Sequence, residues 1–297
     1  MGTTIIRLSI RRTYASAAII AFIGLALVVC AAAAPQHGGA PPATLRGNRT
    51  MVIAHRGGAR EATENTIAAF QRALRLGAEG IETDLRLTRD GVVVLYHDDR
   101  FGRVEGLPAP QRTRLISDMT YAELSATPLL RVGEGDGDSR VPTLDQALAA
   151  IGSGVLNIEI KRGARFDELV NKTIATLKGF PDLDRVVLEP PDLKTAEKLR
   201  EAFGPRLKLH INPEAAGAVP FEAAVEQVLK LRPHSISVHY KRLSLEIVET
   251  AHKAGTEVWV WTVDSPEVAQ AMRLLGVDAI KTDRPKMMLD LFNGRSR

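Results

Sequence analysis

The sequence contains a single cysteine, Cys30, among its 297 residues. Cys30 lies in an apolar N-terminal run, so a chain cut beyond it would have no cysteine and no disulfide. The stability of that chain would come from its hydrophobic core. With 45% hydrophobic residues, the sequence is long enough for one large domain.

The sequence also has little net charge outside its first thirty residues. The formal charge of the whole chain is +4, but Arg7, Arg11 and Arg12 occur in a segment that has no acidic residue. Subtracting these three charges from +4 leaves +1 for the rest of the chain. Proteins that bind nucleic acid usually carry a strong basic patch. The charge balance therefore indicates no nucleic-acid partner.

The N-terminal segment has the organisation of a secretory signal. The three arginines precede an almost wholly apolar or small run, Ala15 to Ala34, which is followed by the Pro-, Gly- and Ala-rich stretch "PQHGGAPPA". This pattern predicts a signal peptide over 1–34 and an exported protein, periplasmic or extracellular. Residues 35–50 are then predicted to form a flexible linker.

Other fates of the leader stay open. "RRTY" is a partial twin-arginine signal. An apolar run of about twenty residues is also long enough to stay in a membrane as an anchor. This N-terminal segment is the only part of the sequence for which membrane contact is predicted. Lipidation at Cys30 is disfavoured, because Val29 stands where a lipoprotein signal needs a small residue.

From residue 51 onward, short β-branched runs alternate with helix-like stretches. The runs are "MVIA", "GIETDLRL", "VVVLYH", "VLNIEI", "RVVLE", "LKLHI", "SISV", "EVWVWTV" and "DAIKT". Regular alternation predicts parallel strands joined by crossover helices, and residues 51–297 suit an α/β fold of the (β/α)8 TIM-barrel type. The stretch from about 100 to 140 interrupts the alternation and predicts an insertion after the third strand. A doubly wound sheet is the rival fold, but no Gly-x-Gly-x-x-Gly follows the first strand.

Several of the predicted strands end in charged or aromatic side chains. Active sites of such barrels lie at the carboxyl ends of the strands. We therefore expect these side chains to meet at one rim: His55 and Arg56, His97 and Asp98, Glu159 and Lys161, Trp261, and Asp283.

Glu82 and Asp84 lie instead near the start of the second strand, two positions apart and so on one face. Asp90 and Gly91 suit a tight turn, so the second and third strands are predicted to form a hairpin. Pairing about that turn would place Glu82 opposite residue 97 or so and Asp84 opposite residue 95 or so. If the third strand carries His97 to the same rim as His55, the second strand should run against the other strands.

Six stretches between Met51 and Pro285 carry a resemblance to a known family. They are "AHRG", "ENT", "GIETDLRLTRDGVVVLYHD", "IEIK", "VWVWTV" and "DAIKTDRP", in this order. Together they resemble the glycerophosphodiester phosphodiesterase family. The resemblance implies a distorted (β/α)8 barrel, a divalent cation, and hydrolysis of small glycerophosphodiesters to glycerol 3-phosphate and an alcohol. It also implies that the glycerol hydroxyl of the substrate attacks phosphorus, and that water opens the resulting cyclic phosphate.

The residue types fit this chemistry. Hydrolysis of a phosphodiester needs a base and an acid, and His55 and His97 are the predicted catalytic pair. Glu82, Asp84 and Glu159 offer only oxygen ligands, which predicts Ca2+ or Mg2+ rather than Zn2+. A divalent cation would also relieve the repulsion among three carboxylates.

Three residues are predicted to bind the substrate. Arg56 offers a planar fork for phosphate and Lys161 a point charge. Trp261 is predicted to form an apolar wall beside glycerol, on the strength of the resemblance. In the alternative interpretation, the two cations only pair with the carboxylates and Trp261 packs in the core.

The chain departs from the family pattern at the rim, where "DRFGRVEG" follows His97-Asp98 and the fifth strand ends "VVLEPPD" instead of in a Ser-Phe pair. These departures bear on the preferred alcohol and leave the histidines and carboxylates untouched. Two other functions stay open: a phosphodiesterase that acts on phospholipids or lysophospholipids, and a non-catalytic envelope-binding module. The sequence indicates no particular oligomeric state.

Overall fold

The computed structural model describes residues 50–103, 111–133 and 137–294. The predicted leader over 1–34 lies outside these residues, as does the predicted linker except for Thr50. None of the helices in the described part of the chain is both long and apolar enough to span a membrane.

Each of the nine predicted strand runs contains a strand. The strands are β1 (Met51–Ala54), β2 (Gly80–Leu87), β3 (Val93–Leu95), β4 (Val155–Ile160), β5 (Val186–Glu189), β6 (Lys208–Ile211), β7 (Ser235–His239), β8 (Glu257–Trp261) and β9 (Ala279–Thr282). The strand order is β1-β9-β8-β7-β6-β5-β4-β2-β3, and β1 also pairs with β2. This last pairing closes eight parallel strands into a barrel, which confirms the predicted fold.

The predicted orientation of the second strand was wrong. β2 is parallel to both β1 and β4, and β3 is the antiparallel member of the hairpin. β2 is long: its first half completes the barrel wall, and its last residues, Leu85 to Leu87, pair with β3. The chain reverses only beyond the rim, so His97 returns to the barrel mouth from outside the wall.

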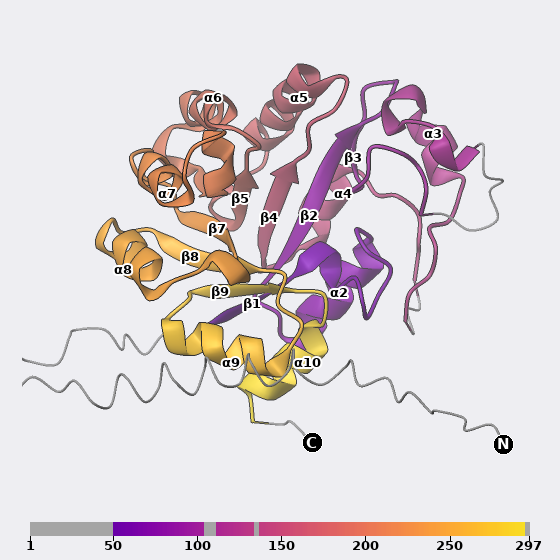
Figure 1. Ribbon diagram of the computed structural model, residues 1–297. Coiled ribbons are helices and arrows are strands. Elements are labelled where there is room, and N and C mark those ends of the chain that lie inside the picture. The colour runs from indigo at the N-terminus through magenta and orange to yellow at the C-terminus, as the bar shows by residue number, and fades with distance from the viewer. Residues whose placement is uncertain (1–49, 104–110, 134–136, 295–297) are drawn as a thin grey trace, which may run out of the picture. The chain divides into compact units, whose positions relative to one another are not determined.

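Helices surround the barrel strands in Figure 1. They are α2 (Ile67–Leu76), α3 (Tyr121–Ser125), α4 (Leu144–Ala150), α5 (Phe166–Lys178), α6 (Leu193–Phe203), α7 (Phe221–Leu229), α8 (Leu245–Lys253), α9 (Pro266–Leu275) and α10 (Pro285–Phe292). Local sequence sets their ends. In α2, the Thr66 side chain accepts a hydrogen bond from the Ala69 amide, and Gly77 ends the helix in the left-handed conformation.

The two faces of the barrel strands have different partners. Outward side chains such as Val52, Leu188 and Ile280 belong to the large core between strands and helices. Inward side chains alternate with them, and a small apolar group (Ile53, Val187, Trp259 and Ala279) fills part of the barrel interior. Polar side chains occupy many other inward positions, among them Glu82, Asp84, Asn157, Glu159, Glu189, His210, Ser237 and Lys281. Several of these inward polar side chains belong to the candidate site.

Residues of the predicted insertion pack against the outer side of the hairpin. Val94 and Tyr96 share a separate buried cluster with Phe101, Ile116 and Leu124. Figure 1 shows α3, which carries Leu124, beside β3. The segment thus has a small core of its own and covers the part of the hairpin that extends beyond the barrel.

Candidate active site

The turn after β1 is built by residues with unusual backbone angles. Residues His55–Gly57 form a single 3-10 turn in which Arg56 has φ 52°. Gly57 has φ 84°, and a Cβ atom there would lie 2.8 Å from the Cβ of Ala69. Only glycine allows both the positive φ and this close approach of α2. The turn presents the side chains of His55 and Arg56 to the barrel mouth.

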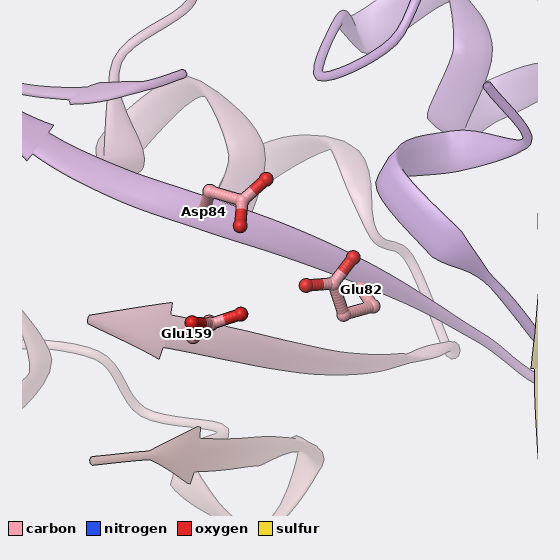
Figure 2. Close-up of side chains that lie close together, drawn as sticks. All are labelled: Glu82, Asp84 and Glu159. Atoms are coloured by element: carbon pink, nitrogen blue, oxygen red, sulfur yellow. The ribbon is translucent and has the colours of Figure 1, made fainter. Parts of the chain in front are cut away.

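Strand register brings the three predicted carboxylate ligands together. Asp84 of β2 is the register partner of Glu159 of β4, and Glu82 lies two residues before Asp84 on the same face. One carboxylate oxygen from each residue lies within 4.8 Å of the other two. Figure 2 shows the three side chains facing a common space between the two strands.

This cluster fits a bound divalent cation. Burial and the neighbouring Asp84 raise the pKa of Glu82, whereas burial and Glu189 raise the pKa of Glu159 to about 7. Burial would also raise the pKa of Asp84, but Lys161 and Arg56 lower it to about 2. Burial and neighbouring anions thus disfavour the ionised form of two of the three carboxylates, an effect that a bound cation would offset. An oxygen-only donor set of this kind suits Ca2+ or Mg2+.

Each predicted catalytic histidine is oriented by a carboxylate at the same ring atom. Nδ1 of His55 lies 2.6 Å from Oδ1 of Asp283, and Nδ1 of His97 lies 2.7 Å from Oδ1 of Asp98. In both rings Nε2 is therefore the atom left to exchange protons with a substrate. The role of Asp283 was not predicted from the sequence, although its place at the last strand end was noted.

The two histidines have different electrostatic surroundings. Burial would lower the pKa of His55, but the carboxylates of Glu82 and Asp283 outweigh burial, and its pKa is raised. For His97 burial prevails over the attraction of Asp84, and its pKa is lowered. A pair of histidines with oppositely displaced pKa values suits two different proton-transfer roles.

Arg56 and Lys161 both contact the carboxylate cluster. Nζ of Lys161 lies 3.0 Å from Oδ1 of Asp84 and 2.7 Å from Oε1 of Glu159. Nε of Arg56 lies 3.4 Å from Oδ2 of Asp84, and its Nη1 donates to both oxygens of Glu64 at 3.4 Å. These ion pairs are those of the alternative interpretation. They also place two cationic side chains at the mouth, beside the carboxylate cluster.

Asn65 holds one of the three clustered carboxylates. Its Nδ2 donates to Oδ2 of Asp84 at 3.0 Å, and its Oδ1 accepts from Oγ1 of Thr83 at 2.7 Å. The residue is buried and has φ 55°. Asn65 therefore fixes the rotamer of Asp84. Its place in the "ENT" stretch was the only signal in the sequence.

Arg103, in the predicted insertion, contacts the carboxylate beside His97 and the carboxylate beside Arg56. Its Nε donates to Oδ2 of Asp98 at 2.8 Å, and its Nη1 donates to Oε2 of Glu64 at 2.8 Å. Asp98 holds His97, and Glu64 holds Arg56. The guanidinium of Arg103 thus links Asp98 to Glu64. Through these two carboxylates it connects the predicted catalytic His97 with the predicted phosphate ligand Arg56.

The two tryptophans of β8 lie at different depths. Trp259 is buried and packs on His210, with ring centroids 4.7 Å apart. Trp261, two residues nearer the mouth, is half-buried and meets the ring of His239 edge to face at 5.1 Å. Trp261 is therefore the tryptophan with a surface available to a ligand.

Comparison with known proteins identifies the family. The sequence model of the "Glycerophosphoryl diester phosphodiesterase family" matches residues 55–287. The chain belongs to this family. The resemblance inferred from the motifs, and the inference that the protein is an enzyme, are both confirmed.

Individual members of the family match along most of their length. The glycerophosphodiester phosphodiesterase of Caldanaerobacter subterraneus is 33% identical over 250 residues, which cover 82% of this chain and 98% of that protein. The crystal structure of the Thermotoga maritima glycerophosphodiester phosphodiesterase has a TM-score of 0.67 and 29% identity, covering 82% of this chain and 98% of that one.

A further relative was solved with its product. The fold of an Oleispira antarctica phosphodiesterase, in complex with sn-glycerol-3-phosphate, is similar with a TM-score of 0.68 and 24% identity, over 82% of this chain and 96% of that one. At that identity the likeness supports the shared barrel fold.

Proposed function

We propose that this protein hydrolyses glycerophosphodiesters to glycerol 3-phosphate and an alcohol. In this proposal Glu82, Asp84 and Glu159 hold a divalent cation, Ca2+ or Mg2+, and His55 and His97 transfer the protons. One observation carries the proposal: three clustered carboxylates lie beside two histidines, each held at Nδ1 by its own carboxylate. The product bound to the Oleispira antarctica relative is consistent with it.

The residues of the chain divide the work of a two-step hydrolysis. Nε2 of one histidine takes the proton of the glycerol hydroxyl as its oxygen attacks phosphorus, and Nε2 of the other gives a proton to the departing alcohol. Water then opens the cyclic phosphate while the two histidines exchange roles, which restores both protonation states. The bound cation would neutralise the three carboxylates and polarise a phosphoryl oxygen.

Arg56, Lys161 and Trp261 are the proposed substrate ligands. The guanidinium of Arg56 and the ammonium of Lys161 would bind the non-bridging phosphate oxygens, because each already lies at the mouth beside Asp84. The half-buried face of Trp261 would pack against the glycerol carbons.

Hydrolysis of a substrate panel tests the proposal. The purified protein is incubated with glycerophosphocholine, glycerophosphoethanolamine, glycerophosphoglycerol and a lysophospholipid, and release of glycerol 3-phosphate or its acylated form is measured. We expect turnover of the glycerophosphodiesters, loss of turnover in excess chelator, and recovery with Ca2+ or Mg2+. Turnover of the lysophospholipid alone would favour the lipid-directed alternative. Undiminished activity after rigorous metal removal would contradict the role of the carboxylates.

A variant that lacks one of the three carboxylates complements the chelator experiment. Glu82→Gln keeps the shape of the side chain and its backbone contact with Arg56 while removing one anionic ligand. We expect it to need a higher concentration of cation for half-maximal activity and to unfold at an unchanged temperature. Wild-type cation dependence in this variant would exclude Glu82 as a ligand.

We also propose that the protein is exported. This rests on the sequence pattern of residues 1–34, which lie outside the described residues. Intact-mass analysis of the secreted protein should give a start between Cys30 and Gln36. A retained leader would favour the membrane-anchored form instead.

A further inference from the structure

A second group of charged side chains lies inside the barrel. Glu189 ends β5 and Lys281 lies in β9, and these residues are only 6% and 3% exposed. Nζ of Lys281 lies 2.6 Å from Oε2 of Glu189. His210 of β6 is fully buried, with Nε2 3.7 Å from the same oxygen and Nδ1 2.8 Å from Oγ of Ser235. The proposed reaction uses none of these groups.

Glu189 continues the row of carboxylates that begins with the proposed ligands. Asp84 is the register partner of Glu159, and Glu159 is the register partner of Glu189. Register partners on parallel strands project from the same face of a sheet, so all three side chains point into the barrel. Even so, Glu189 does not belong to the group of carboxylates whose oxygens lie within 4.8 Å of one another.

The ammonium of Lys281 explains why Glu189 lies outside the cluster of three carboxylates. Burial would raise the pKa of Glu189, but Lys281 and His210 hold it well below its usual value, so the carboxylate is a fixed anion bound to a cation on the far side of the barrel. Lys281 also interacts favourably with the ionised form of Glu82. The positive charge of Lys281 therefore acts on a proposed ligand and on the carboxylate next to the ligands.

A buried ion pair is seldom needed for packing. Taking two charges out of water costs several kcal/mol, and apolar residues of similar volume are often at least as stabilising. A role in the site, rather than in stability, explains why the barrel interior carries the pair.

We propose that Lys281 is a positioning residue that holds Glu189 away from the cation site. It thereby limits the site to three carboxylates and sets its affinity for divalent cations. This inference rests on the cation site of the proposed function, and it assigns a role to two residues outside that site.

Three variants of the purified protein test the inference by calorimetric titration with Ca2+ and with Mg2+. Lys281→Met removes the ammonium and frees Glu189, so cation binding should tighten on the order of tenfold. Glu189→Gln leaves the ammonium uncompensated beside Glu82, so binding should weaken on the order of tenfold. The double variant Lys281→Met with Glu189→Leu removes both charges and should bind within about threefold of the wild type.

A carboxylate–histidine contact at the other end of the barrel is the control. Asp278 precedes β9, and its Oδ2 lies 2.8 Å from Nε2 of His252. Asp278→Asn should lower the unfolding temperature and leave cation affinity unchanged.

The outcomes separate the inference from the proposed function. Opposite shifts in the two single variants support it. If the wild type binds the cation and every variant binds it with the same affinity, the role of Lys281 alone is overturned. A shift of affinity in the same direction in both single variants overturns it as well. A wild-type protein that binds neither cation overturns the cation site and this inference together. If Lys281→Met does not fold, Glu189→Gln against the double variant gives the same decision, because weakening should occur only in the former.

Discussion

Replacement of Asp283 by asparagine tests how the structure orients His55. Oδ1 of Asp283 lies 2.6 Å from Nδ1 of His55, and the two side chains are only 19% and 16% exposed. A hydrogen bond between charged groups contributes about 1.5–3 kcal/mol. Since the charge on the imidazole of His55 changes during proton transfer, loss of that interaction should lower kcat by about 10- to 150-fold. The smaller value applies if the asparagine oxygen still accepts from Nδ1.

The assay is steady-state hydrolysis of glycerophosphocholine at saturating cation, together with thermal unfolding. Asp264→Asn is the matched control. Its Oδ1 accepts from the Asp283 amide at 2.8 Å and from Oγ1 of Thr282 at 3.0 Å, and it makes no described contact with His55. We expect kcat to fall in Asp283→Asn and to stay close to the wild-type value in Asp264→Asn. A folded Asp283→Asn variant with kcat within twofold of the wild type would refute the orienting role.

Four further predictions follow from single contacts. Arg56→Lys should raise KM or lower kcat at saturating cation without changing the melting temperature, because an ammonium cannot reproduce the planar fork; wild-type kinetics would exclude phosphate binding by Arg56. Arg103→Ala should lower kcat/KM by up to about fivefold, the effect expected of partly exposed ion pairs, whereas Arg140→Ala, which breaks a pair with Asp138 in the same insertion, should have no effect; equal effects would contradict a specific role. Gly57→Ala should destabilise the fold by about 1–3 kcal/mol in denaturant unfolding, because alanine is strained at φ 84°; an unchanged midpoint would argue against this. Burial lowers the pKa of His210 well below its usual value, so as the pH falls through about 6.5 only the unfolded chain binds a proton at this residue. The free energy of unfolding should therefore be highest above about pH 6.5 and decline below it. His210→Asn should flatten this decline, and an identical pH profile in the variant would show that other groups cause it.

The sequence was sufficient to predict which side chains meet at the barrel mouth because the relevant signals are local. His55, Arg56, Glu159 and Lys161 each follow or end a short apolar strand, and parallel strands bring their carboxyl ends to one rim. The pairing of Glu82 and Asp84 on one face needed only the two-residue period of a strand. Strand and helix alternation likewise predicted the barrel.

The orientation of the hairpin could not be read from the same patterns. A turn at Asp90 and Gly91 requires only that two strands be antiparallel, and does not say which of them joins the barrel. The pairing of β2 with β1, Ala54 beside Ile81, decides that question. This pairing depends on closure of the whole barrel and leaves no trace in the local sequence.

The sequence by itself determined the strand and helix alternation and the candidate catalytic and metal-binding residues, since each depends on residues close together in the chain. Only the tertiary structure decided which carboxylate orients which side chain. Asp283 lies 228 positions from His55, and Lys281 lies 92 positions from Glu189. Contacts at such separations form when the strands close into a barrel, and each is set by the register of many strands at once rather than by the residues beside it.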